Sequence, residues 1–225
     1  VLEGLGRAAS EICEKRHKRV TEDIRRTIAA FLRPGDIIVT RHAKALTNLF
    51  LPGFWPHAAF YIGTPGQRIA ASIEVDAARE ERWVGDVCML EALKDGVRFR
   101  PLEETLAVDV FAVLRPELEP ESVRQAIERA VQHEGKMYNF DFDFFSSDRL
   151  VCTEVIYRAY DGLEDLRFPL QERAGRKTLS AEDLLDFALD DGAFEPVAIF
   201  GVEGCEGEIE FGEQVRPILV ESYGG

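Results

Sequence analysis

One cysteine in the chain, Cys152, stands at the point where a loop becomes an apolar helix. Val155, Ile156 and Ala159 recur after it at helical spacing, which predicts a helix whose first turn contains Cys152. Unpaired backbone N–H groups and the positive end of the helix dipole favour an anion in that turn. A thiol held there tends toward the thiolate, the form that attacks carbonyl carbons. Taken alone, however, the pattern is more typical of a small buried cysteine.

A histidine upstream offers the partner that such a nucleophile needs. Residues 55–63 read as a loop that places His57 on the first residue of a strand, with a turn over residues 63–66 after it. An imidazole facing the thiol can take its proton and later return it to a leaving group. Without the cysteine segment, His57 would be better explained as a structural histidine at a strand edge.

A third polar group would orient the imidazole through its other nitrogen. Glu91 is the acid within the apolar part of residues 86–93, a run that could lie beside the histidine strand. A solvent-facing strand residue is an equally good interpretation of Glu91. Glu74 and Asp76 are the competing candidates.

The order of these segments resembles a known family. His57, Glu91 and Cys152 follow one another, with Arg-Pro-Gly-Asp at 33–36 ahead of them and Gly-Lys-Met-Tyr-Asn-Phe-Asp at 135–141 before the cysteine. This order is similar to the circularly permuted, YiiX-like branch of the NlpC-type cysteine peptidases, which also includes lecithin-retinol-acyltransferase-like proteins. The resemblance implies an α+β, papain-like fold, with an antiparallel sheet or small barrel packed against helices.

The resemblance also implies roles for individual residues. Cys152 would be the nucleophile, His57 the general base and then acid, and Glu91 the orienting group. The hydroxyl of Tyr138 would stabilise an oxyanion together with the backbone N–H of Cys152. Asp141 could bind a cation or favour a substrate that carries an ammonium group. Cys152-Thr153-Glu154 stands where many relatives have Cys-Ser-Glu, which keeps a hydroxyl at the second position.

The connection before the histidine, residues 46–55, is unusually apolar and aromatic. It could pack on the core, which we favour, or wall an apolar groove for an acyl chain or hydrophobic side chain. In the second case Trp55 would contact the substrate.

Composition predicts one globular domain over residues 1–225, because 46% of the residues are hydrophobic and 30% are charged. We divide it into a helical extension at 1–32, the catalytic core at 33–162 and an addition at 163–225 that packs on the core. The net charge of −14 argues against nucleic acid as a partner. Contact with a membrane is compatible with the sequence but not required by it, and the oligomeric state stays open.

The four cysteines are widely spaced and form no Cys-x-x-Cys pair. We therefore predict one reactive thiol, with no disulfide scaffold, structural metal or cofactor. The first residues carry no signal-peptide segment. Because the chain begins with Val1, an upstream signal could have been removed, and the location stays open between cytoplasm and periplasm.

The remaining pattern predicts the elements that must position the site. We expect helices over 10–32, 120–135 and 180–189, and strands over 36–40, 70–75, 87–92, 97–100, 108–114, 197–202 and 215–220.

The residues predict a thiol hydrolase, and the resemblance implies that it is of the bacterial cell-wall amidase and peptidase type. By the resemblance, it would cleave an amide of a small peptide, such as a γ-glutamyl or lysine-containing one, or an ester, through a thioester on Cys152. Two alternatives stay open. One is an acyltransferase or thioesterase acting on a lipid-like substrate, and the other is a binding module that keeps the fold without catalysis.

Overall fold

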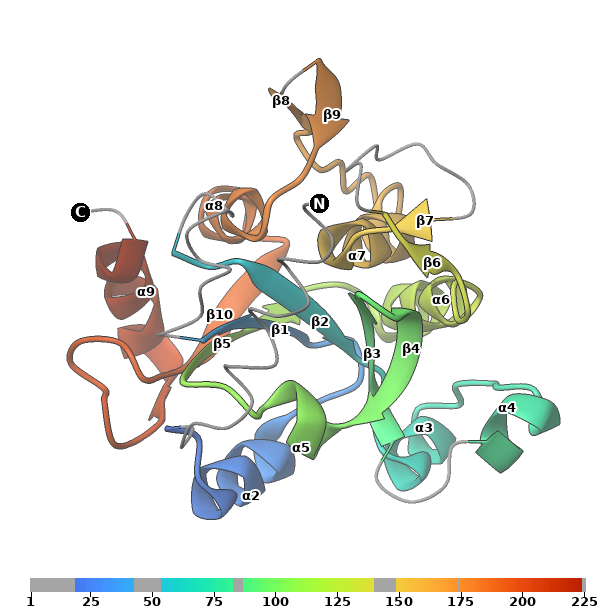
Figure 1. Cartoon of the computed structure of the whole chain (residues 1–225), viewed down its shortest axis with the longest axis horizontal. Coiled ribbons are helices and arrows are strands. Elements are labelled where there is room, and N and C mark those ends of the chain that lie inside the picture. The colour runs from blue at the N-terminus through green and yellow to red at the C-terminus, as the bar shows by residue number, and fades with distance from the viewer. Residues whose placement is uncertain (1–18, 43–53, 83–86, 140–148, 174, 224–225) are drawn as a thin grey trace, which may run out of the picture.

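The computed structural model describes residues 19–42, 54–82, 87–139, 149–173 and 175–223. In this part of the chain the main sheet has seven strands in the order β11-β10-β5-β1-β2-β3-β4, and all its neighbouring pairs are antiparallel (Figure 1). These strands are β1 Ile37–Arg41, β2 His57–Tyr61, β3 Val87–Leu93, β4 Gly96–Pro101, β5 Val110–Pro116, β10 Phe194–Phe200 and β11 Glu210–Phe211. The predicted α+β class with an antiparallel sheet packed against helices is confirmed.

Helices cover both faces of this sheet, and two short strand pairs lie outside it. Figure 1 shows α6, α7 and α8 on one side and α2 with α5 on the other. The helices are α2 Glu22–Phe31, α3 Pro65–Ala70, α4 Ala77–Arg82, α5 Leu102–Thr105, α6 Pro120–Val131, α7 Cys152–Tyr160, α8 Ala181–Asp191 and α9 Val215–Tyr223. The strand pairs are β6 Met137–Tyr138 with β7 Arg149–Leu150, and β8 Gln171–Arg173 with β9 Arg176–Thr178.

Alternation along the strands divides the core into two clusters. Ile37 and Val39 of β1 face the larger cluster, which includes apolar residues of α6, α7, α8 and α9, whereas Ile38 faces the smaller one with Ile28 of α2. Both faces of the central strands are therefore buried, which explains why β1 reads as a continuous apolar run.

The Pro34-Gly35-Asp36 segment connects α2 to β1 and joins several elements. Asp36 is fully buried, and the guanidinium of Arg115 on β5 donates to its two carboxylate oxygens at 3.0 and 2.8 Å. The backbone N–H of Arg33 donates to the same carboxylate at 2.8 Å. Gly35 has φ of +98°, and a Cβ there would lie 2.5 Å from a methyl group of Val123 on α6. The segment that carried part of the family resemblance thus has a structural role.

Two segments predicted as strands, residues 70–75 and 215–220, do not form strands in the structure. Within residues 70–75, Ala70 ends α3, which begins at a capping box formed by Thr64 and Gln67, and Ser72 has φ of 52°, outside the extended region. Residues 215–220 lie in α9, where Val215 and Leu219 are buried four positions apart while Val220 is exposed. A short apolar run fits both periods, and here the spacing of the buried residues is helical.

The helix predicted over residues 10–32 is described only in its second half. Thr21 caps α2 by accepting the N–H of Ile24, and residues 1–18 lie outside the described part. The addition at 163–225 extends the sheet, because β10 pairs with β5.

Replacing Asp36 by alanine should strongly destabilise the protein, because the largely buried guanidinium of Arg115 would lose its counter-charge. We expect the free energy of unfolding to fall by about 3 to 5 kcal/mol, measured by urea denaturation. Asp23→Ala is the matched control, because its carboxylate pairs with Arg26 on the exposed surface of α2 and should cost less than about 1 kcal/mol. Equal losses in the two variants would contradict the structural role of Asp36.

Candidate active site

Cys152 is the first residue of α7, as the sequence predicts. The preceding residue, Val151, has an extended backbone and forms the N-cap. The backbone N–H groups of Ala58 and Thr153 donate to the Cys152 sulfur. The thiol therefore lies where backbone dipoles stabilise a negative charge.

His57 is the first residue of β2, also as predicted, and it is hydrogen-bonded to Cys152. α7 packs against β2, and the interaction of Cys152 with His57 shows that the first residues of the helix and the strand meet. The His57 Nε2 atom lies 2.7 Å from Oε2 of Glu91. This leaves Nδ1 as the ring nitrogen available to the thiol.

Glu91 lies on β3 with only 3% of its surface exposed. Its second oxygen, Oε1, accepts a hydrogen bond from the Thr105 hydroxyl at 3.0 Å and lies 3.3 Å from Nε of Arg100. The rival candidates Glu74 and Asp76 are both exposed. The structure thus brings Cys152, His57 and Glu91 together.

The charges of this group shift the pKa values in the directions that an ion pair requires. Burial disfavours the charged imidazolium, but Cys152 and Glu91 outweigh it and raise the pKa of His57 to about 10. Burial likewise opposes the thiolate, but the charge and hydrogen bond of His57 and two backbone N–H groups lower the pKa of Cys152. Against burial, His57, Arg100 and Thr105 keep the pKa of Glu91 below its usual value. A thiolate and an imidazolium are the forms favoured at neutral pH.

Arg100 and Thr105 were missed by the sequence reasoning. Arg100 sits diagonally across the β3–β4 ladder from Glu91, because Glu91 pairs with Arg98, two residues earlier on the same face. The alternation of arginines at 98 and 100 was therefore an available signal. Thr105 comes from α5, and no local pattern marks it.

The other predicted site residues lie in different surroundings. Tyr138, on β6, is half-buried, and burial together with the nearby charge of Cys152 raises the pKa of its hydroxyl. Trp55 has 1% of its surface exposed and packs in the larger core cluster, where Nε1 donates to the Ser222 hydroxyl at 3.2 Å. Core packing, the favoured alternative, thus holds for Trp55. Asp141 lies outside the described residues.

A second buried carboxylate follows the cysteine by two residues. Glu154 is fully buried, accepts the N–H of Val151 at 3.4 Å and pairs with the Arg158 guanidinium at 2.7 Å. Burial raises the pKa of Glu154 to about 7, although Arg158 opposes the shift. This pair fixes the first turn of α7, which carries Cys152.

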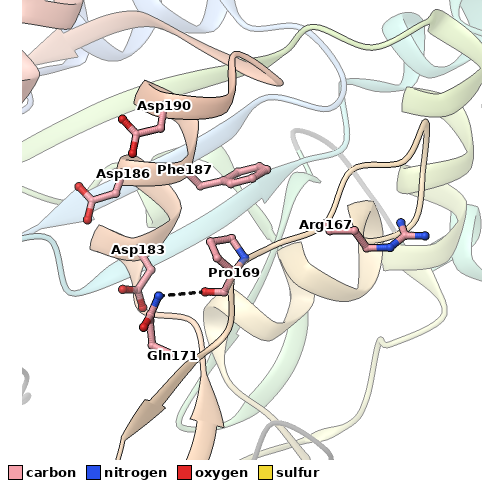
Figure 2. Close-up of a pocket in the computed structure, with 7 residues that line it drawn as sticks. All are labelled: Arg167, Pro169, Gln171, Asp183, Asp186, Phe187 and Asp190. Atoms are coloured by element: carbon pink, nitrogen blue, oxygen red, sulfur yellow. Dashed lines mark hydrogen bonds between the residues drawn. The ribbon is translucent and has the colours of Figure 1, made fainter.

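A hollow of about 480 Å³ lies beside α8 and shows a different chemistry (Figure 2). Its lining combines acidic side chains with one arginine and an aromatic ring, from Arg167, Pro169, Gln171, Asp183, Asp186, Phe187 and Asp190. Neither His57 nor Cys152 lines it. Over the described ranges, no group of three or more His, Cys, Asp or Glu residues is placed to hold a metal ion. The same ranges contain no helix long and apolar enough to cross a membrane.

A histidine-first order, a thiol at a helix start and an antiparallel sheet define a permuted papain-like protein. The chain matches the family described as "permuted papain-like amidase enzyme, YaeF/YiiX, C92 family" over residues 31–194, and it belongs to that family. The crystal structure of metalloprotein yiiX from Escherichia coli O157:H7 is similar, with a TM-score of 0.48 and 20% identity over 82% of this chain and 91% of that chain. No curated protein matches the chain.

The state of the thiol predicts a distinctive pH profile for alkylation of Cys152 by iodoacetamide. Alkylation should persist well below the ~8.5 of a free thiol and rise again where His57, with its pKa near 10, loses its proton. Mass spectrometry of the Cys152 peptide measures this without replacing the buried Cys88 and Cys205. His57→Ala should show one transition near ~8.5. A wild type that behaves like this variant would contradict the ion pair.

Replacing Glu91 by glutamine should weaken the pair, because the imidazolium loses its buried counter-charge. We expect the rate of Cys152 alkylation at about pH 6 to fall roughly tenfold or more, as one pKa unit corresponds to a factor of ten. Glu104→Gln is the matched control, since Glu104 pairs with the same guanidinium of Arg100 but is exposed. A rate that is unchanged in Glu91→Gln would contradict the role of Glu91.

Proposed function

We propose that the protein is a cysteine amidase in which Cys152 is the nucleophile and His57 the general base and acid. The observation that carries this proposal is the hydrogen-bonded chain from Cys152 through His57 to Glu91, with 2.7 Å between His57 Nε2 and Glu91 Oε2. Because the family is described as an amidase family, we favour an amide over an ester as the bond that is cleaved.

The reaction begins with attack of the Cys152 thiolate on the substrate carbonyl carbon, which forms a C–S bond and places negative charge on the oxygen. The backbone N–H of Cys152 at the start of α7 and the Tyr138 hydroxyl are the donors that we assign to this oxyanion. The imidazolium of His57 then gives its proton to the leaving nitrogen, the C–N bond breaks, and a thioester remains.

Hydrolysis of the thioester completes the cycle. His57, now neutral, takes a proton from water while the oxygen attacks the thioester carbonyl. The C–S bond breaks, the acid product leaves, and the thiolate and imidazolium are restored. Glu91 keeps the imidazole oriented and stabilises its charged form through both steps.

For the substrate we propose an amide of a small peptide of the cell-wall type, such as a γ-glutamyl or lysine-containing one. Asp141 stays a prediction as a contact for an ammonium group. A lipid-directed acyltransferase would require an apolar groove formed by residues 46–55, and of these only Phe54 and Trp55 are described. The burial of Trp55 gives that alternative no support. A binding module would have no need of a depressed thiol pKa.

Exposure to p-nitrophenyl acetate, a general acyl donor, should release one p-nitrophenol per chain in a burst and leave one acetyl group on Cys152. Intact-protein and peptide mass spectrometry detect the adduct. Cys152→Ala should show no burst and lose roughly 10³-fold or more in turnover. Stoichiometric acetylation elsewhere, or a burst in Cys152→Ala, would overturn the assignment of the nucleophile.

Peptide amides then distinguish the substrate classes. γ-Glutamyl and lysine-containing peptides are incubated with the wild type and Cys152→Ala, and hydroxylamine is added as a competing nucleophile. A thioester intermediate should divert product to the hydroxamate in the wild type. Cleavage of acylated lipids but not of peptides would favour the lipid alternative.

A further inference from the structure

The residue just before the cap of α8, Leu179, contacts the helix that carries Cys152. The hydroxyl of Thr153, the residue after Cys152, donates to the backbone oxygen of Leu179 at 2.5 Å. Thr153 is buried, so the bond is shielded from water. The segment that leads into α8 is thereby tied to the first turn of α7.

The first turn of α8 contacts the loop that delivers His57. Oε1 of Glu182 accepts hydrogen bonds from the backbone N–H groups of Phe54 and Trp55, the latter at 3.3 Å. Only Pro56 separates this anchored pair from His57. Hydrogen bonds from backbone N–H groups to a carboxylate are stronger than those between neutral groups.

Further contacts restrict the loop around Glu182. The guanidinium of Arg41 on β1 donates to the Phe54 oxygen at 2.5 Å and lies 4.0 Å from the centre of the Phe54 ring. Its charge also interacts with Glu182. Burial of Trp55 fixes the next residue. The backbone that enters β2 is thus held by side chains from separate parts of the chain.

Several contacts fix the start of α8 in place. It can therefore hold both the first turn of α7 and the loop before His57. Ser180 caps it, accepting the N–H of Asp183, whose carboxylate accepts the N–H of Ser180 in return at 2.7 Å. Arg173 pairs with both oxygens of Asp183 at 2.7 Å. Leu184 and Leu185 are fully buried in the larger core cluster.

We infer that Glu182 is a positioning residue for His57, and that the turn of residues 179–182 sets the spacing of the thiol and the imidazole by holding both chain segments. This inference rests on the proposed function, because it assigns the turn a role in the same Cys152–His57 pair. Glu182 acts through the loop backbone.

The test compares the pH profile of Cys152 alkylation in Glu182→Ala with the wild type. Loss of the carboxylate releases the loop, so the rate at about pH 6 should fall roughly tenfold as the profile moves toward the ~8.5 of a free thiol. Glu182→Gln keeps an oxygen that can accept the two N–H groups and should restore most of the low-pH reactivity. Asp190→Ala removes an exposed carboxylate from the far end of α8 (Figure 2) and should leave the profile unchanged.

The outcomes separate this inference from the proposed function. A wild type that titrates as a free thiol overturns both. An ion-pair profile in the wild type that is unchanged in Glu182→Ala, whether or not the melting temperature falls, overturns the positioning role alone. If Glu182→Ala does not fold, Glu182→Asp replaces it, because the shorter side chain withdraws the carboxylate from the loop and keeps the charge. The rate of Cys152 alkylation at about pH 6 should fall in Glu182→Asp as well. An unchanged pH profile in this variant would equally contradict the positioning role of Glu182.

Discussion

The hydrogen bond between His57 and Glu91 requires the Glu91 carboxylate to stay ionised inside the protein. Several neighbouring groups stabilise its negative charge. Removing a carboxylate from water is costly unless opposite charges and hydrogen bonds replace its hydration. Arg100 and Thr105 supply the replacement from β4 and α5. The tight β3–β4 hairpin that brings Arg100 beside Glu91 is thus part of the site. Arg100 and Thr105 act on Cys152 only indirectly, through Glu91 and His57.

The position of α7 depends on polar contacts at both of its ends. At the first turn, Glu154 pairs with Arg158 and accepts the N–H of Val151. At the last, the Tyr160 hydroxyl donates to the backbone oxygen of Gly35 at 2.6 Å, beside the buried Asp36. A helix held in this way cannot slide along the sheet without breaking several buried polar contacts. The thiolate position is therefore a property of the core and does not depend on a surface loop.

Local signals in the sequence located the parts of the site that are set by a single element. Cys152 was found because a helix start has its own pattern, and His57 because it opens a strand. Glu91 was one of three candidate acids, noted because it lies within an apolar run, and its orienting role came from the family resemblance. Thr105 and Glu182 act through contacts between separate elements, which no periodicity within one element records. The strand predicted at 215–220 was wrong for a related reason, since a short apolar run becomes a helix or a strand according to which neighbours bury it.

The addition after residue 162 has more to do with the site than its sequence indicated. It supplies β10, which pairs with β5 next to the central strand β1, and α8, whose first turn contacts the loop before His57. The residue before the α8 cap, Leu179, contacts the helix of Cys152. The family match also continues past residue 162 to residue 194, which covers α8. In a site where two residues from opposite ends of the core must meet within hydrogen-bonding distance, a third segment bonded to both limits their relative motion more than either could alone. The folding of residues 163–194 and the geometry of the Cys152–His57 pair are therefore coupled.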